Sequence, residues 1–421
     1  MGLLLTTIYR GLVIPALRVT LAVLAPFRPK IAKRRREEQL AWENASKQLK
    51  TEARPRVWFH AASMGELEQL LPVIERLKEQ HANVCVVSTC TSPSGRDHAL
   101  RQSCIDHALY LPLDSTSAIQ RFVDAIDPVC VVIDRYDVWP AMISTLHRRA
   151  VPVHLINATM PSVATRPFLR SFVARMYSQL TTVTAVTQTD ADALSRLLGR
   201  VIPYRPDTRM DRVSDRVERA TKKRPTLPPW NGGTLVLGSS WSEDERMMIE
   251  AWKRSNMLSW RLIIVPHEPS EDALQAIEQQ IECRRLSTLL REELTAGSPH
   301  ILVDSVGHLL ELYCTATAAY VGGGFGAGVH SLAEPAGFGI PLACGPRVAR
   351  SRDAAMLLAR GALDILRSKD DAERWLRNLQ DPSFCEDMGT KSRNIVTEYT
   401  GSSDYYLAMI QTHLLGKPPS A

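Results

Sequence analysis

The sequence lacks any Cys-x-x-Cys pair, although it contains eight scattered cysteines. Zinc sites and disulfide frameworks show closely repeated cysteine spacings, so we expect neither. Several cysteines lie in apolar runs such as "ANVCVVSTC", which is typical of buried, reduced thiols in a cytosolic compartment. The Asp-x-Asp within "TDADA" (residues 189–193) is better interpreted as a helix cap with acids in the first turn. We therefore expect no metal site.

The N-terminal stretch "MGLLLTTIYRGLVIPALRVTLAVLAPF" also lacks a clean spanning run, because Arg10, Pro15 and Arg18 interrupt it. A spanning helix needs about 20 mainly apolar residues, and a signal peptide carries its positive charges before the apolar part. Here "RPKIAKRRR" (residues 28–36), with six basic residues and no acid, follows the apolar part. This order favours a membrane-associating segment at residues 1–30 that docks on the cytoplasmic leaflet. The alternative is a buried first helix followed by a solvated basic turn.

The bulk composition indicates a globular protein of two domains. The chain has 421 residues, of which 45% are hydrophobic and 23% are charged. This length exceeds that of one ordinary domain, and the composition can form real cores. The net charge of +6 is modest for this length and gives no reason to expect a nucleic-acid partner.

From Arg56 onward, short β-rich runs alternate with amphipathic stretches, which predicts a parallel sheet covered by helices on both faces. The alternation fails around residues 205–233, whose Pro- and Gly-rich latter part we interpret as a linker, and then it restarts. We predict an α/β protein with two Rossmann-like, doubly wound domains, at residues 31–215 and 216–421, the second including the terminal helices. Two such halves facing a cleft would bind ligands beyond the carboxyl ends of their strands.

The first candidate loop is "HAASMGELEQ" (residues 60–69), where a strand gives way to a helix. Gly65 permits a tight turn. Glu66 has two interpretations: an acid in the first turn favours the helix dipole, and a carboxylate at this edge of the sheet can also be catalytic. The spacing leaves both open.

Two loops of the second half carry polar groups at strand ends. In "GSSWSEDE" (residues 238–245), Ser239 and Ser240 offer hydroxyl and N–H groups to a phosphate. Ser242 is a candidate helix cap, and Glu245 would complete a capping box. In "IIVPHEPS", His267 follows a buried strand; a lone histidine is more often structural, but this position makes it a candidate.

The stretch "YVGGGFGAGVHSLAEPAGFGIPLACGP" has five glycines between Gly322 and Gly328 but no phosphate-loop spacing. We expect these glycines, with Gly323, Gly324 and Gly326 at the centre, to let the backbone approach a ligand closely. Because His330 and Glu334 are four residues apart, we expect them on one face of a helix, where Glu334 can accept hydrogen bonds from a ribose diol. There is no nucleophile elbow.

Taken together, these loops resemble the 3-deoxy-D-manno-octulosonic acid (Kdo) transferase family over nearly the whole chain. "HAASMGE" is similar to the family's Ser-x-Gly-Glu loop. Further similar segments follow in the family's order: "STCTSPSG", "LYLPLD", "YDVWP", "LINATM", "DTRMDRV", "GSSWSEDE", "VPHE", "LVDSVGHLLELY" and "VGGGFGAGVHSLAEPAGFGIPLACGP". One such motif is weak, whereas a full set in register is specific.

The resemblance implies a GT-B glycosyltransferase, specific for lipid A, that moves Kdo from CMP-Kdo to a lipid A precursor (lipid IVA) in lipopolysaccharide core biosynthesis. It implies inversion, no metal and no cofactor, with CMP-Kdo as the donor substrate. Glu66 would be the general base, and Glu334 would hold the ribose. The residues around the phosphate and the sugar would be Ser239, Ser240, His267, Gly323, Gly324, Gly326 and His330. The location implied is the cytoplasmic face of the inner membrane.

The sequence departs from the family pattern at two places. Arg135 stands where many members carry an acid, with Asp137 second, and Val329 and Ser331 replace residues of a Gly-Gly-His-Asn motif. These departures concern the acceptor contacts and the number of sugars added. Two alternatives are a GT-B transferase or epimerase using another sugar nucleotide, and a non-catalytic nucleotide-binding protein at the membrane surface.

Overall fold

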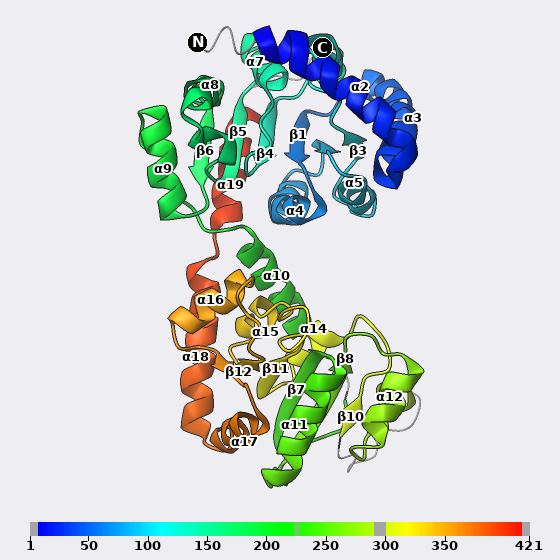
Figure 1. The fold of residues 1–421 in the computed structure, drawn as a ribbon, viewed down its shortest axis with the longest axis vertical. Helices are drawn as coiled ribbons and strands as arrows, with labels where there is room; N and C mark the ends of the chain where they lie inside the picture. The colour runs from blue at the N-terminus through cyan, green and yellow to red at the C-terminus, as the bar shows by residue number, and fades with distance from the viewer. Residues whose placement is uncertain (1–6, 224, 226, 290–299, 415–421) are drawn as a thin grey trace. The chain divides into compact units, whose positions relative to one another are not determined.

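The computed structural model describes residues 7–223, 225, 227–289 and 300–414, which form two compact units (Figure 1). Unit 1 contains the described residues up to Arg212 together with those from Thr400 to Leu414. Unit 2 runs from Val213 to Tyr399. Each unit is built around its own parallel sheet, which confirms the predicted α/β class.

The sheet of unit 1 has, over the described residues, six strands in the order β3-β2-β1-β4-β5-β6. Neighbouring strands pair in parallel throughout. This is the doubly wound order of dinucleotide-binding folds, in which the chain reverses direction across the sheet between β1 and β4. The strands are β1 (Arg56–Ala61), β2 (Cys85–Cys90), β3 (His107–Tyr110), β4 (Cys130–Asp134), β5 (Val153–Ala158) and β6 (Thr182–Ala185).

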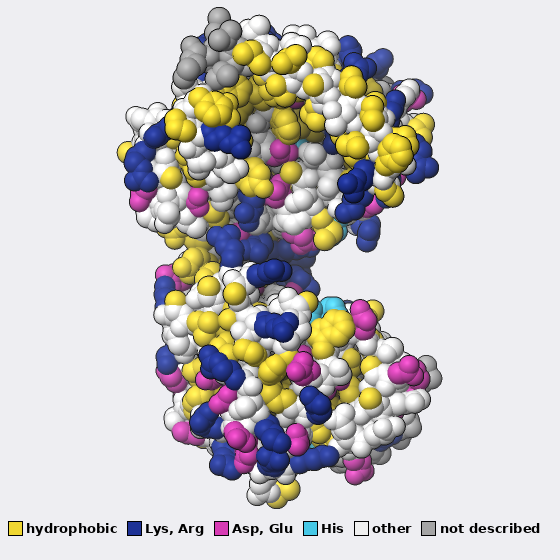
Figure 2. Space-filling view, viewed as in Figure 1, with side chains coloured by type: hydrophobic (Ala, Val, Ile, Leu, Met, Phe, Trp, Pro, Cys, Tyr) yellow, Lys and Arg dark blue, Asp and Glu magenta, His cyan; other side chains and the backbone are white. Residues whose placement is uncertain are grey.

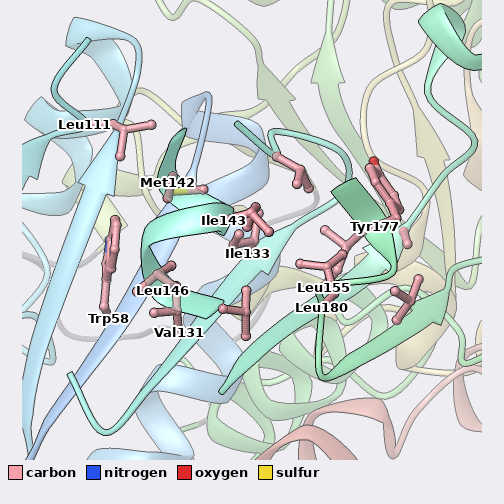
Figure 3. Close-up of a cluster of buried hydrophobic side chains, with 14 of the residues drawn as sticks. Trp58, Leu111, Val131, Ile133, Met142, Ile143, Leu146, Leu155, Tyr177 and Leu180 are labelled. Atoms are coloured by element: carbon pink, nitrogen blue, oxygen red, sulfur yellow. The ribbon is translucent and has the colours of Figure 1, made fainter. Parts of the chain in front are cut away.

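Helices cover both faces of this sheet, so its strands are buried on both sides. Figure 3 shows one of the two cores, with Trp58, Val131 and Ile133 of the strands against Met142 and Leu146 of a helix. That face is covered by α3 (Pro29–Thr51), α6 (Thr116–Ile126), α7 (Pro140–Arg148), α8 (Pro167–Tyr177) and α9 (Gln188–Leu198). The other is covered by α4 (Met64–Gln80), α5 (Pro93–Ala99) and α19 (Ser402–Leu414).

The sheet of unit 2 has, over its described residues, seven strands in the order β13-β12-β11-β7-β8-β10-β9. Here the chain reverses direction between β7 and β11, which pair in parallel. The strands are β7 (Gly233–Ser240), β8 (Trp260–Pro266), β9 (Arg284–Arg285), β10 (Ile301–Leu302), β11 (Ala318–Val321), β12 (Leu342–Cys344) and β13 (Asp364–Ile365).

Unit 2 is likewise covered on both faces. One core involves α11 (Ser242–Arg254), α12 (Glu271–Glu278) and α17 (Lys369–Asn378). The opposite core involves α13 (Leu286–Leu289), α14 (Leu309–Tyr313), α15 (Ala333–Gly337), α16 (Arg352–Ala359) and α18 (Pro382–Glu398).

The first crossing between the units, after Arg212, lies within helix α10 (Arg209–Lys222), three residues before the predicted boundary. The Pro- and Gly-rich segment that we interpreted as the linker follows this helix and is part of unit 2. The prediction that the terminal helices belong to the second domain is wrong for α19, which belongs to unit 1. Asp211 explains this return, because its buried carboxylate accepts hydrogen bonds from the backbone N–H groups of Gly401 and Ser403.

The first described residues form apolar helical turns, and residues 1–6 of the predicted membrane-associating segment lie outside the described residues. A short helical turn at Tyr9–Val13 leads into α2 (Ile14–Leu24) and a further turn at Ala25–Phe27. Among the described residues, Tyr9–Phe27 alone is long and apolar enough to cross a membrane, judged by length and composition, with a mean hydropathy of 1.5. Hydrophobic side chains are exposed along these turns, as seen at the top of Figure 2.

Candidate active site

The predicted site loops lie where each sheet reverses direction. In unit 1, Glu66 follows β1 and Asp137 follows the adjacent strand β4. In unit 2, Ser239 and Ser240 end β7, and the glycine loop (Gly322–Gly328) follows the adjacent strand β11. These carboxyl-end positions are where open α/β sheets bind ligands.

Glu66 is in the first turn of α4, and part of its side chain caps that helix. Ser63 Oγ accepts a hydrogen bond from Glu66 N at 3.4 Å, and Ala62 N donates to Glu66 Oε2 at 2.6 Å. The structural interpretation of Glu66 therefore accounts for one carboxylate oxygen. The other, Oε1, has no hydrogen-bond partner among the described residues. It is available to a ligand.

The surroundings of Glu66 favour a proton acceptor. The side chain is 8% exposed, and this burial raises its pKa, an effect that the nearby negative charge of Asp137 reinforces. Burial also raises the pKa of Asp137, but the hydrogen bonds that its Oδ2 accepts from His60 Nε2 (2.9 Å) and Thr91 Oγ1 (3.1 Å) outweigh it and bring the pKa below its ordinary value. Asp137 is therefore ionised beside a carboxyl whose pKa is raised.

Arg135 has a structural role in this chain. Its backbone is in the left-handed region (φ 61°), and its Nε donates to Gln69 Oε1 at 2.9 Å. Its Nη2 lies 3.8 Å from Asp207 Oδ2. The substituted cation thus connects the end of β4 to α4, the helix that carries Glu66.

The serine pair of unit 2 is placed at the end of a distorted strand. Ser239 has φ 49°, unusual for a residue with a side chain, and the pairing of β7 with β8 shifts register there. Ser240 Oγ donates to Glu245 Oε1 at 2.8 Å, so its proton is already used. The predicted cap at Ser242 is wrong: α11 begins at Ser242, and Asp244 Oδ2 accepts from Trp241 N instead.

The glycine loop approaches neighbouring backbone as closely as the sequence predicted. Gly323 has φ 88°, and a Cβ on Gly324 would lie 2.5 Å from Gly345 Cα, in the next strand-end loop. Buried Asp244 fixes the start of the loop, because its Oδ2 accepts from Gly323 N at 2.9 Å and its Oδ1 accepts from Tyr320 OH at 2.7 Å. One carboxylate thus connects the β7 and β11 loops.

A methyl group at Gly324 should therefore disrupt this loop. We expect Gly324→Ala to weaken nucleotide binding at least tenfold. The new methyl group would overlap the backbone of Gly345, which cannot move aside without a shift of its own loop. Gly326→Ala is the matched control, since the nearest atom to its Cβ would be 3.9 Å away. Titration calorimetry with CMP checks this; equal affinities of the two variants would contradict it.

His267 and His330 come together with an unpredicted partner, Trp241. The two imidazoles stack with centroids 4.3 Å apart, and the Trp241 ring lies 4.9 Å from His267. Trp241 Nε1 donates to His330 Nε2 at 3.2 Å, so that nitrogen carries no proton. Burial and the neighbouring His267 lower the pKa of His330, which is consistent with a neutral ring.

The prediction that His330 and Glu334 share a helix is wrong. Helix α15 begins at Ala333, and His330 stays in the preceding loop because its N–H donates to Gly322 O at 3.1 Å. Glu334 is in the first turn of α15, where Oε1 forms an ion pair with Arg216 Nη1. Val329 packs partly buried against one of the unit 2 cores, whereas Ser331 is exposed.

Three functional candidates were missed by the sequence reasoning. Asp244 and Trp241 lie within the "GSSWSEDE" segment but were not among the predicted site residues. Arg347 donates from Nη1 to Gly326 O at 2.6 Å, which places an exposed guanidinium on the glycine loop. The Gly-Pro dipeptide before Arg347 indicated the loop but not the contact.

One group of side chains in the described residues has metal-ligand chemistry. Atoms of Glu52, Cys85 and His107 lie within 4.8 Å of one another, at the amino-terminal ends of β1, β2 and β3. Glu52 is already paired with Arg54 at 2.7 Å, and burial raises the pKa of Cys85 to about 12. The group lies at the sheet edge opposite Glu66, and its paired carboxylate and protonated thiol make poor ligands.

Comparison with protein families supports the assignment from the site loops. The family model for 3-deoxy-D-manno-octulosonic-acid transferase (kdotransferase) matches residues 34–212, which fall within unit 1. The 3-deoxy-D-manno-octulosonic acid transferase of Chlamydophila psittaci is 29% identical over 73% of this chain and 73% of its own. The enzyme of the same name from Haemophilus influenzae is 23% identical over 85% of this chain and 87% of its own.

Comparison with solved structures supports the fold. UDP-GlcNAc 2-epimerase from Neisseria meningitidis, bound to UDP-GlcNAc, aligns with a TM-score of 0.53 at 15% identity. The alignment covers 86% of this chain and all of the other. At this identity the likeness concerns the two-domain fold alone.

Proposed function

We infer that the chain is a glycosyltransferase of the Kdo transferase family, and we propose that it moves Kdo from CMP-Kdo to a lipid A precursor, lipid IVA. The proposed reaction inverts the anomeric configuration and requires no metal. The family supports Kdo transfer in lipopolysaccharide biosynthesis. The donor, the acceptor and the roles of the residues below belong to the proposal.

The observation that carries the mechanism is the geometry of Glu66. Oε2 is held by Ala62 N, Oε1 is free to accept a proton, and burial raises the pKa of the group. In the proposed step, Oε1 takes the proton of the acceptor hydroxyl while the hydroxyl oxygen bonds to the anomeric carbon of Kdo. The bond from that carbon to the phosphate oxygen breaks, and CMP leaves with the electron pair. Attack opposite the leaving group gives inversion.

The loops of unit 2 supply the proposed donor site. Glu334 would bind the ribose diol, and the glycine loop would leave room for the sugar and its single phosphate. Arg347, which lies on that loop, would meet the phosphate or the Kdo carboxylate as a charged hydrogen-bond donor. The donor carries only one phosphate, so few donors are needed to stabilise the leaving group.

The exposed apolar face of the first helices supports a place at the cytoplasmic face of the inner membrane. Val19 and Val23 of α2 are 63% and 61% exposed. We expect the double variant Val19→Asp with Val23→Asp to lose most of its binding to anionic vesicles in a flotation assay, because charge is costly in the apolar interface. Val201→Asp, at a valine outside these helices that is 90% exposed, is the control. Undiminished flotation of the double variant would reject docking through this face.

The proposed reaction is tested by incubating the full chain with CMP-Kdo and lipid IVA in the presence of EDTA. We expect CMP release that depends on the acceptor, and a product whose anomeric configuration is opposite to that of the donor. Loss of activity in EDTA, restored by a divalent cation, would overturn metal independence. Conversion of UDP-GlcNAc in place of CMP-Kdo would favour the epimerase alternative.

A further inference from the structure

A cavity of about 930 Å³ lies in unit 1 between the N-terminal helices α2 and α3 and the strand-end loops after β2 and β3. Its frame is held by specific bonds. Tyr9 OH donates to Asp114 Oδ2 at 3.0 Å, and Arg10 Nη2 donates to Ser144 Oγ at 2.9 Å. Arg34 donates to Thr91 O and to Leu111 O, so it connects α3 to both strand ends. The cavity is thus a feature of the folded unit.

Helix α2 is apolar on two sides, and only one of them faces the cavity. Ile14, Leu21 and Ala22 line the cavity. Val19 and Val23 do not line it and are exposed. A helix with a single apolar face would be explained by packing on its own unit. The second apolar face, which carries Val19 and Val23, points away from the cavity and is suited to an apolar environment.

The charge around the cavity is strongly one-sided. Its lining contains six basic residues and one acid, Glu38. Arg34 Nε lies 3.6 Å from Glu38 Oε2, and burial raises the pKa of that carboxyl. In contrast, four lining cations have no hydrogen-bond or ion-pair partner in the described part of the chain: Arg18, Lys30, Arg35 and Arg121. All four are exposed to solvent, and their gathering around one cavity favours an anionic ligand, because guanidinium groups bind phosphate especially well.

The cavity is separate from the carboxylate of the proposed reaction. Neither Glu66 nor its neighbours His60 and Asp137 line it, although Thr91 contributes to its wall. A sugar acceptor must bring its hydroxyl to Glu66. The volume is in the range of cavities that hold one moderate-sized ligand, roughly 300–1,000 Å³, which is small for a whole acceptor with several acyl chains. We therefore expect its occupant to be a smaller amphipathic anion.

We propose that this cavity binds one anionic glycerophospholipid of the surrounding bilayer, with its phosphate at the four unpaired cations and its upper acyl chains against the apolar wall. The site is distinct from the sites for the sugar donor and the sugar acceptor. A lipid bound in this cavity would contact both the N-terminal helices and the loops at the strand ends of unit 1. Membrane docking would therefore stabilise the packing of these helices against the loops. The choice of a bilayer lipid over the sugar acceptor rests on the proposed role of Glu66, whereas the binding of an anionic lipid does not.

The test uses dihexanoyl phosphatidylglycerol at monomeric concentrations, titrated calorimetrically into the full chain. We expect saturable binding of one molecule per chain, with at least tenfold weaker binding of dihexanoyl phosphatidylcholine and of glycerol 3-phosphate. The first comparison removes the net negative charge, and the second removes the chains. Equal affinity for the two phospholipids would overturn the proposal.

Two matched pairs of variants locate the site. Ala22→Trp fills the cavity without changing charge, and Ala16→Trp adds the same bulk to an exposed position of α2 outside the lining. We expect loss of binding in the first variant and unchanged binding in the second. Arg35→Ala should weaken binding about fivefold, whereas the exposed neighbour Arg36, which is outside the lining, should tolerate the same change.

Ala118→Trp fills the cavity from α6 and serves if the change at Ala22 prevents folding. Equal binding by Ala22→Trp and Ala16→Trp would place the lipid elsewhere and overturn the proposal. Stoichiometric displacement of the phospholipid by lipid IVA would also overturn it, by assigning the cavity to the acceptor. These outcomes concern lipid binding alone, so they are independent of whether the protein transfers Kdo.

Discussion

Glu66→Gln is expected to lower the rate of sugar transfer by about a hundredfold to ten-thousandfold while leaving CMP affinity unchanged. General-base catalysis typically contributes this much. The amide oxygen of glutamine can still accept from Ala62 N, and Ser63 still caps α4, so the helix start should persist. The change removes the basic oxygen without removing the cap. Single-turnover transfer assays and CMP titration measure the two quantities separately.

The matched control for this prediction is Glu79→Gln, an exposed carboxylate on the same helix. We expect it to transfer Kdo at the normal rate. Two results would contradict the base assignment: transfer by Glu66→Gln within tenfold of normal, or a loss of CMP affinity as large as the loss of rate. The second result would indicate general disruption.

The pH dependence of transfer carries the same assignment further. A base acts in its deprotonated form, so the rate should fall as the pH drops through the pKa of Glu66. Because burial and the charge of Asp137 raise that pKa, the fall should begin above the value for an ordinary glutamate, about 4.3. Asp137→Asn removes the nearby charge and should shift the acidic limb to lower pH. A limb that does not move would show that another group titrates.

Glu334→Ala is expected to weaken CMP binding by about tenfold to a hundredfold. A hydrogen bond to a charged group contributes roughly 1.5–3 kcal/mol, and each 1.4 kcal/mol is a factor of ten in affinity. Arg216 pairs with Oε1 and orients the carboxylate from one side. The loss should be larger for CMP than for cytosine, which lacks the ribose diol. Equilibrium titration with both ligands measures the difference.

The control for Glu334 is Arg216→Ala, because it breaks the same ion pair and leaves the carboxylate in place. We expect a smaller loss of CMP affinity than for Glu334→Ala, with a similar change in melting temperature. Equal losses in the two variants would indicate that the ion pair, rather than contact with ribose, maintains the site. Unchanged CMP affinity in Glu334→Ala would contradict the ribose role outright.

The strands and the loops at their ends could be predicted because their signals are local. A run such as Cys130–Asp134 is buried over its whole length, and such runs appear in the sequence as continuous apolar stretches. The glycine loop could also be predicted, because its concentration of glycines is a local signal. The structure explains two of them: Gly323 has a backbone conformation that favours glycine, and Gly324 has no space for a side chain. In each unit, these features place the candidate loops at the carboxyl edge of its sheet.

The remaining features depend on contacts between distant segments. The return of α19 to unit 1 requires Asp211 to bind Gly401 and Ser403, and nothing near Asp211 in the sequence announces them. Likewise, His330 leaves the helix expected for it because its N–H finds Gly322 O. The stack of Trp241, His267 and His330 comes from three different loops. Spacing along the chain carries no signal for such contacts.

The measurement that tests the central claim most directly is the mass of lipid IVA after incubation with CMP-Kdo and the full chain. We predict an increase equal to one or more Kdo residues with the unaltered protein, and almost no increase with Glu66→Gln within the time in which the unaltered protein completes transfer. The number of added residues also gives the sugar count. An unchanged acceptor mass with the unaltered protein, with CMP-Kdo intact, would contradict the account.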